Sequence, residues 1–448
     1  MTLPVSSTTA TVGTKQQERD TYLKSLLQTL QASVPTSLAY TSVRSPAEAL
    51  VREHTFPTPR DEEWRFTDLT PMVSVPLQAY PSIATTDVDS LAWVPMPEAI
   101  ARIVLVNGQF NAALSDLSAL PAGVTVGSLA QLQGQAIAPQ IEARLAQSSS
   151  NNDVFTALNT VGFQDAAVVW VPRNCSVEQP IQVVYLAAGQ AEPMIASPRC
   201  LLVAETGSAV TLVEEFGGDL QDAHCTNSVT EIWADDSAQV THVRLQQEGL
   251  GTFHIGKTVV TQGRDSRYTV TNVSLGARVA RHNLEVYQTG AQTDTNLYGL
   301  TAIAGTQLAD THSLIALNHP HGTADQLHKC IVDDQGHAVF NGKVWVPRHA
   351  QLTNASQLNR NLLLSGKARV DTKPELDIVA DNVKCAHGAT VSQLNANEVF
   401  YLQSRGISAA AAQRLLIYGF AMDIIDRIPV VSLRETLMQA VTQRIQTH

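Results

Sequence analysis

The sequence predicts a mainly β protein, because its central region is patterned like a series of strands. From about Ala166 to about Asn397, short apolar runs are separated by Gly, Asp, Ser or Pro, and no long helical stretch interrupts them. Within Thr241–Gln246, two kinds of side chain alternate with a period of two, as on a strand whose faces differ. A third observation, a faint repeat, predicts how these strands are wound.

The repeat indicates a parallel β-helix. Three turns place Ser208, Ser237 and Ser266 at intervals of 29 residues, and Ala338 and Ala368 lie 30 residues apart in two later turns. A β-propeller blade needs about 40 residues, whereas a period of about 29 residues fits one coil of a β-helix. About eight coils, each rising about 4.8 Å, would form a rod on the order of 40 Å long.

Other elements flank this core and define three regions. Helical spacing of leucines predicts a helix at Lys15–Ala32, and Asn107-Gly108 is a strong turn signal after a strand. Further helices are predicted at Pro46–Glu53 and Ser128–Gln147, and the strand at Ile103–Val106. The chain therefore divides into a mainly helical α/β region (1–160), the β-helix core (161–396) and a C-terminal helical domain (397–448).

The C-terminal domain is predicted to contain three helices. The first, Glu398–Ser404, is closed by Gly406 in the left-handed conformation, and the second, Ala409–Ile428, is capped by Ser408. The third covers Leu433–Ile445. The second helix carries an apolar stripe formed by Leu416, Phe420, Ile424 and Ile428. These helices have little core of their own, so they must pack on the rod, on a partner, or on both.

Composition argues against several classes of protein. The net charge is −11 and no basic run is present, so neither a nucleic acid nor an anionic membrane is expected as a partner. The apolar runs are too short to span a bilayer. The five cysteines are dispersed without a CxxC pair, which favours a reducing compartment, and Met1–Lys15 contains no Arg. A cytoplasmic protein is therefore predicted.

One short segment carries a pair of candidate metal ligands. On a strand, Cys385 and His387 would project from the same face about 7 Å apart, and a thiolate beside an imidazole suits iron or zinc. Two ligands are too few for a closed site. The alternative is that Cys385 is a small buried hydrophobic residue and His387 a hydrogen-bonded residue at a strand edge.

Two further sets of residues have weaker claims to a function. The first is a run of possible ligands within 26 residues, any of which could equally lie on a solvated strand face: His312, His319, His321, His328, Cys330 and His337. The second consists of carboxylates that could serve a carbohydrate-active enzyme, although they resemble turn residues: Asp333, Asp334, Asp377 and Asp381. No P-loop, GxSxG, GxGxxG or HExxH motif is present, so another chain must supply any nucleotide site.

Several motifs resemble the SufB/SufD family of iron–sulfur cluster assembly proteins in their order and spacing. They are Asp310–His312, Ala338–Val344, Ala350–Gln357, Asn361–Ser365, Asp371–Ile378 and Phe400–Ile407, preceded by weaker matches at Pro59–Thr67 and Val106–Phe110. The segment Cys385–Thr390 is similar to the Cys-Ser-His-Gly-Ala-Thr of the SufD members, with Ala386 in place of Ser. The SufB members carry a His-Glu pair there, and their N-terminal cysteine motif is absent.

The resemblance implies a right-handed parallel β-helix whose end strands pair with those of SufB, and C-terminal helices that dock the ATPase SufC. It implies a scaffold for de novo cluster assembly rather than an enzyme. His387 and Cys385 would bind iron or a nascent cluster transiently, sharing it with SufB, and no cofactor would stay on the isolated chain. The residues carried over as partner-binding are Phe400, Tyr401, Arg405, Gly406, Leu416, Tyr418 and Phe420.

Two alternatives remain beside this interpretation. One is a stand-alone β-helix enzyme that acts on carbohydrate, and the other is a SufB-like subunit that holds the cluster itself. In isolation, an open β-helix edge would also allow two copies of the chain to pair as a homodimer.

Overall fold

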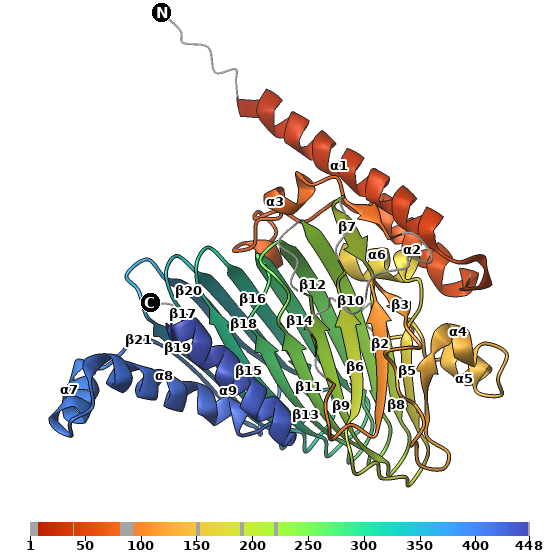
Figure 1. Cartoon of the computed structure of the whole chain (residues 1–448). Coiled ribbons are helices and arrows are strands. Elements are labelled where there is room, and N and C mark those ends of the chain that lie inside the picture. The colour runs from red at the N-terminus through yellow and green to blue at the C-terminus, as the bar shows by residue number, and fades with distance from the viewer. Residues whose placement is uncertain are drawn as a thin grey trace, which may run out of the picture.

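The computed structural model describes residues 8–38, 40–80, 93, 95–148, 153–188, 192–218 and 223–446. Two long sheets, built mainly of parallel strands, face each other, and from Arg199 to Gln393 successive strands alternate between them (Figure 1). This arrangement is a parallel β-helix, so the predicted mainly β fold is confirmed.

Sheet A has 11 strands in the described part of the chain. Its spatial order is β4 (Thr125–Ser128), β5 (Ala167–Val171), β8 (Arg199–Ala204), β10 (His224–Ala234), β12 (Thr252–Gln262), β14 (Val279–Gln288), β16 (Leu308–Ala316), β18 (His337–Val346) and β20 (Arg369–Ile378), with β7 (Met194–Ala196) beside β10 and β1 (Gln78–Ala79) beside β7.

Sheet B has 10 strands by the same description. Its spatial order is β3 (Gln109–Phe110), β2 (Ala101–Val106), β6 (Ile181–Leu186), β9 (Ala209–Gly217), β11 (Gln239–Gln246), β13 (Arg267–Ser274), β15 (Asp294–Ile303), β17 (Thr323–Val332), β19 (Asn354–Leu363) and β21 (Lys384–Gln393). The turn after β2 is the predicted one, because both Asn107 and Gly108 have positive φ.

Strand register shows the repeat and corrects its phase. From β5 onward, strands that pair between successive coils are offset by between 26 residues, from Phe253 to Val279, and 33 residues, from Ala167 to Cys200. The residues that stack at the predicted turns are Gly207, Ser237 and Asp265, in line with the flanking strand pairs. The serine spacing of 29 therefore averages a coil of 30 residues and a coil of 28. The later alanines are also out of phase, because Ala338 pairs with Val370 rather than with Ala368.

A column of left-handed residues forms one corner of the coil. Its members with positive φ are Asn174, Gly207, Ser237, Asp265, Gln292, His321 and Leu352. The N–H group of each donates to a carbonyl of the following coil, for example Ser237 to Arg264 at 2.7 Å and Leu352 to Asn382 at 2.8 Å. The column therefore links each coil to the next by a backbone hydrogen bond along the rod.

N-terminal helices cover the outer face of sheet A. The helices are α1 (Thr8–Ser33), α2 (Thr41–Glu53), α3 (Thr70–Val73), α4 (Leu129–Leu132), α5 (Ala138–Glu142) and α6 (Val154–Gly162), with 3-10 turns η1 (Thr36–Leu38) and η2 (Glu62–Trp64). Apolar side chains from α1 and α6 pack against sheet A residues such as Phe253 and Ile255. The predicted helix at Ser128–Gln147 was wrong: α4 and α5 are separate because Gly134 has φ of 80° and Pro139 begins a new helix.

C-terminal helices cover the outer face of sheet B, as their lack of a separate core predicted. They are α7 (Ala396–Ser404), which projects beyond the sheet, and α8 (Ala409–Ile425) and α9 (Val431–Gln446), which pack on it. Ser408 caps α8 and Gly406 has φ of 86°, both as predicted. The predicted stripe was wrong by one residue in its first half. Ile417 and Ala421 are buried with sheet B, whereas Leu416 and Phe420 are only half-buried.

The first 160 residues also add strands to the rod, since β2 joins sheet B and β4 joins sheet A. The boundaries near residues 160 and 396 stay predictions. Within the described ranges, no helix is long and apolar enough to cross a membrane.

The left-handed corner gives a first testable prediction. Replacing Gly207 by Ala should destabilise the protein by about 1–2 kcal/mol, because the residue has φ of 72° and a Cβ would lie 2.5 Å from Asn174 Oδ1. Urea denaturation measures the change. Gly366→Ala is the matched control, since that turn glycine has room for a Cβ and no positive φ. Equal stability of the two variants would contradict the role of the corner.

Candidate functional site

The rod ends in two strands that each have an unpaired edge, β20 in sheet A and β21 in sheet B. Arg369 N–H donates to the carbonyl of Gly336, just before β18, and Lys384 N–H donates to that of Thr353, just before β19. Every second residue of each strand, beginning with the next one, therefore directs its backbone groups outward. Pro374 lies among these outward residues of β20, where its missing N–H costs no hydrogen bond within the sheet. Unpaired edges of this kind are templates for strands of another chain.

Cys385 and His387 project from this end into the lumen between the sheets. Cys385 pairs with Ala355 and His387 with Gln357, and both of those residues are buried inside the rod. The spacing of the pair on one strand face is therefore as predicted. Cys385 is half-buried against the apolar cluster inside the rod, and burial raises the pKa of its thiol. His387 is exposed, because no further coil lies over it.

The other candidate ligands do not converge. Among the described residues, no group of three or more His, Cys, Asp or Glu side chains could hold a metal ion. His312 contacts Asp310 and Glu63 on the outer face of sheet A, and His337 contacts Asp371. His328 and Cys330 are buried in the lumen, and His319 and His321 lie in a turn. The pair at the end of the rod therefore remains incomplete within this chain.

The carboxylates weighed for carbohydrate chemistry are also dispersed. Asp333 and Asp334 belong to the turn after β17, and Asp377 on β20 faces Lys343 at 3.3 Å. Asp381 is exposed in the turn before β21. The clustered acid and base that glycoside cleavage requires is not formed by these residues.

A buried polar network in the lumen was missed by the sequence analysis. Glu214 accepts hydrogen bonds from Tyr185 at 2.8 Å and from His242 at 2.9 Å. The sequence signal was present at Thr241–Gln246, where His242, Arg244 and Gln246 alternate with apolar residues. Alternation does not say which face is inside, and here the polar face points into the rod.

The network continues with a second carboxylate. Glu248 lies 2.6 Å from His254, and the guanidinium of Arg244 also bonds to that imidazole. Burial disfavours the charge on Glu248, but His254 and the hydrogen bonds from Thr226 and Gln246 prevail and lower its pKa to about 2. The lumen therefore holds compensated charge rather than the dry aliphatic core of an ordinary sheet pair.

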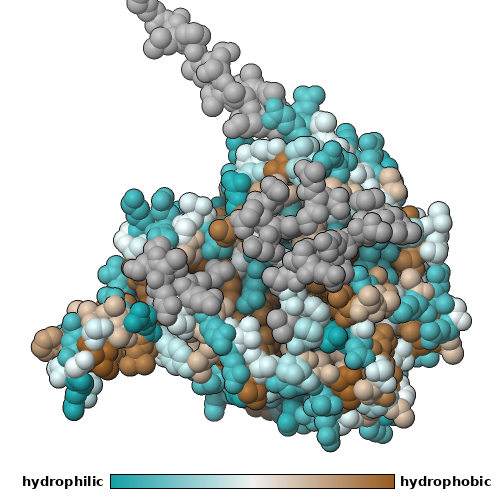
Figure 2. All heavy atoms as spheres, viewed as in Figure 1, coloured by the Kyte–Doolittle hydropathy of each residue, from teal (hydrophilic) through white to brown (hydrophobic). Residues whose placement is uncertain are grey.

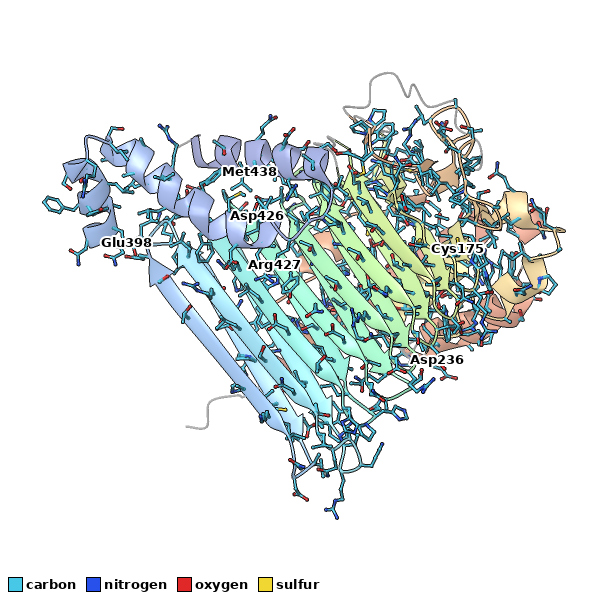
Figure 3. All side chains as sticks on the ribbon, turned by 90° about the horizontal axis from the view of Figure 1, so that it is seen from below. Cys175, Asp236, Glu398, Asp426, Arg427 and Met438 are labelled. Carbon is cyan, nitrogen blue, oxygen red and sulfur yellow. The ribbon has the colours of Figure 1, made fainter. Side chains whose placement is uncertain are left out.

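The C-terminal helices extend past the last strand. In Figure 3, Glu398 on α7 lies beyond β21, whereas Arg427 after α8 lies over the sheet. Arg427 stacks on Tyr298 at 4.1 Å, and Lys329 Nζ donates to the carbonyl of Phe420 at 3.1 Å. No residue of α7 is buried. The second half of α8 is thus fixed to the rod, while α7 projects from it.

The projecting end carries most of the predicted partner-binding residues. Phe400 is 70% exposed and Tyr401 57% exposed, and the guanidinium of Arg405 lies 5.4 Å from the Tyr401 ring. Gly406 closes α7, and Leu416, Tyr418 and Phe420 on α8 are half-buried. Hydrophobic side chains gather visibly at this end of the molecule (Figure 2).

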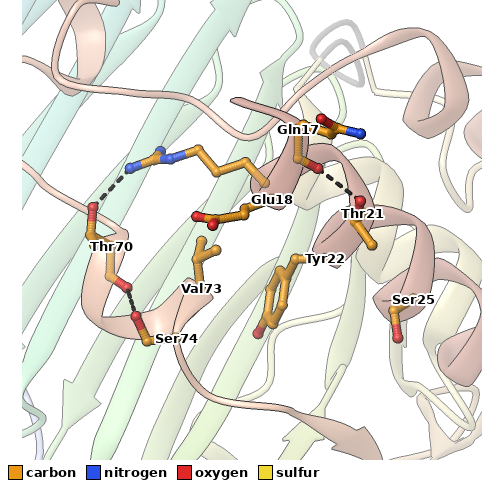
Figure 4. Close-up of a pocket in the computed structure, with 9 residues that line it drawn as sticks. Gln17, Glu18, Thr21, Tyr22, Ser25, Thr70, Val73 and Ser74 are labelled. Carbon is orange, nitrogen blue, oxygen red and sulfur yellow. Dashed lines mark hydrogen bonds between the residues drawn. The ribbon is translucent and has the colours of Figure 1, made fainter. Parts of the chain in front are cut away.

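A groove between α1 and α3 lies at the N-terminal region, away from β21. Its volume is about 700 Å³, and Figure 4 shows residues that line it. One lining residue, Arg19, donates to Thr70 Oγ1 at 2.9 Å. The lining is mixed, with Glu18, Tyr22 and Val73 among its residues. It contains none of the residues predicted from the sequence as a site.

Comparison with known proteins decides the family. The model of the SufBD core domain, described as SUF system FeS cluster assembly, matches residues 185–420, and the SufBD N-terminal region matches residues 17–183. This chain belongs to the SufBD family. Members of the family are iron–sulfur cluster assembly proteins, as the resemblance predicted.

Relatives match over most of this SufBD protein. A SufBD family protein of Synechocystis is 43% identical over 99% of this chain and its own full length. Protein ABCI7, chloroplastic, of Arabidopsis thaliana is 36% identical over 92% of this chain and 87% of its own. The SufD protein of Escherichia coli is 30% identical over 87% and 89%, respectively.

Two of the family-like motifs pack against each other. Thr67 Oγ1 donates to Asp310, and His312 lies 3.1 Å from Glu63. The guanidinium of Arg281 lies 3.9 Å from the ring of Trp64. The N-terminal motif at Pro59–Thr67 is therefore a brace on the outer face of sheet A.

A buried histidine in the lumen predicts that the folded protein loses stability in acid. Burial lowers the pKa of His328 to about 4, whereas an unfolded histidine titrates near 6.5. Between these values the unfolded chain binds the proton that the folded chain refuses, so stability falls as pH drops from 6.5 to 4. At about pH 5, His328 alone should account for about 2 kcal/mol.

Urea denaturation at about pH 7 and about pH 5 tests this prediction. The loss of unfolding free energy between these two pH values should be smaller for His328→Gln than for the native chain. His321→Gln changes an exposed histidine instead and should leave the loss unaltered. An equal loss for all three proteins would show that His328 does not contribute.

Proposed function

We propose that this SufBD protein acts as a SufD-type scaffold subunit in a complex with SufB and SufC, where iron–sulfur clusters are built de novo. The observation that carries the proposal is the placement of Cys385 and His387 on the end strand β21, facing inward, with no further ligand beside them among the residues that the structure describes. A strand of SufB paired with this end would bring the remaining ligands.

The chemistry of the two side chains fits a transient cargo of iron or a nascent cluster. The Cys385 thiol has a raised pKa because it is partly buried, so it keeps its proton until a metal ion displaces it. The His387 imidazole supplies a nitrogen ligand. Two ligands alone hold iron weakly, so a cluster shared with SufB can be passed on.

The C-terminal helices are the proposed docking site for the SufC ATPase. α8 is fixed to sheet B, and α7 offers Phe400 and Tyr401 to a partner. ATP hydrolysis would then take place on SufC, and this chain would be a scaffold without catalysis of its own. The five free cysteines favour a reducing location such as the cytoplasm. In the absence of SufB, the same open edges would allow a homodimer.

His387→Ala should lower the rate of cluster formation in the reconstituted SufB–SufC complex about tenfold or more, because one ligand to the cluster is lost. Absorbance and circular dichroism of the cluster measure it. Cys385→Ser should have a similar direction of effect. His321→Ala, an exposed histidine in a turn, is the matched control. Native rates with His387→Ala would rule out the assignment.

Phe400→Ser combined with Tyr401→Ser should weaken binding of SufC by about 1–2 kcal/mol per aromatic ring, without altering the melting temperature. Titration calorimetry with purified SufC measures the affinity. Leu250→Ser is the control, since Leu250 is 56% exposed in the loop between β11 and β12. Unchanged affinity of the double variant would move the SufC site away from α7.

A further inference from the structure

A column of three polar residues leads through the lumen to the end of the rod. Gln326 on β17 pairs with Gln357 on β19, and Gln357 pairs with His387 on β21. Each step is one strand spacing, about 4.8 Å. The column therefore places Gln357 directly beneath the imidazole of His387.

Hydrogen bonds fix the orientation of the two amides. Gln326 Nε2 donates to Ser313 Oγ at 2.7 Å, which ties sheet B to sheet A across the lumen. Gln357 Nε2 donates to Gln326 Oε1 at 2.8 Å. Gly342 on the facing strand leaves the room that the Gln357 amide occupies, because a Cβ there would collide with it.

The side-chain oxygen of Gln357 in this column has no hydrogen-bond donor among the described groups. Gln357 is only 2% exposed, and among the described groups no donor reaches its Oε1 atom. A buried acceptor without a partner costs about 1–3 kcal/mol. The nearest coil that can supply an N–H group is the last one, where His387 follows in the same column.

We propose that Gln357 is a positioning residue for His387. A turn of the exposed His387 ring about its side-chain bonds would let this Oε1 atom accept the N–H of one imidazole nitrogen, which would fix the tautomer and leave the lone pair of the other nitrogen available to a metal. The positioning itself depends only on this chain. Its use in cluster assembly rests on the function proposed above for His387.

Asn361 supplies a matched comparison on the same strand. It is fully buried, it faces the lumen, and its Oδ1 atom also lacks a donor among the described groups. Its partner on the last strand is Val391, which has no side-chain N–H. The two amides thus differ mainly in whether a histidine lies over them.

Nitrogen NMR of the full chain labelled in histidine tests the proposal at about pH 8.5, where ordinary histidines are neutral. The His387 signals are assigned with His387→Gln. In the native chain His387 should show one dominant tautomer. In Gln357→Met it should show the mixture of an exposed ring, for which His321 is the internal reference.

Asn361→Leu should leave the tautomer of His387 unchanged, and Gln357→Glu should retain it because a carboxylate also accepts. A mixture in the native chain, or one tautomer in Gln357→Met, would overturn the proposal. If Gln357→Met fails to fold, loss of the tautomer in Gln357→Glu would overturn it instead.

Cluster assembly with SufB and SufC separates this inference from the proposed function. Gln357→Met should slow assembly about tenfold, as loss of a group that orients a metal ligand does. A tautomer change without any effect on assembly would confirm the positioning and refute the role of His387. If Gln357→Met slowed assembly but left the tautomer of His387 unaltered, the positioning role of Gln357 would be refuted and the proposed function would stand.

Discussion

The stacking of one coil on the next at about 4.8 Å is the constraint on which the rest of the structure depends. Every inward side chain has a neighbour directly above it and another below it, so the composition of a column is decided by what can stack. Gln326 and Gln357 satisfy this by amide hydrogen bonding along the column. At β20 and β21 the stack ends, and His387 has a neighbour on one side only.

Compensated charge in the lumen follows from the same constraint. A buried Glu214 or Arg244 is tolerable only where the adjoining coils bring partners, as His242 and His254 do. A slip of one residue in β11 would turn His242 and Arg244 to the outer face and put Val243 into the lumen, which would leave Glu214 and His254 without these partners. We infer that the network holds the coils in register more than it adds net stability.

The sequence predicted much of the fold but not the inside of the rod. A period near 29, an amphipathic C-terminal domain and the shared face of Cys385 and His387 all depend on local spacing, which can be read from residues. Which face of Thr241–Gln246 points inward depends on the neighbouring coils and on α9. The helical stripe missed Ile417 by one position because half-buried neighbours such as Leu416 fit the same period. The sequence allowed the prediction that Cys385 and His387 form an incomplete ligand set. It could not show that Gln357 Oε1 lacks a hydrogen-bond donor, because this depends on which residues pair between neighbouring strands.

Under the proposed function, partner choice and completion of the site would be one event. Bare strand edges invite unspecific pairing, and the outer face of β20 opposes it with the charged residues Arg369, Asp371 and Lys373. A partner must therefore match both the backbone edge and this charge pattern. Any strand that does so continues the inward columns, and it sets its own side chains one spacing from His387. In the proposed complex, the ligands that complete the site would thus be selected by the strand pairing that forms it.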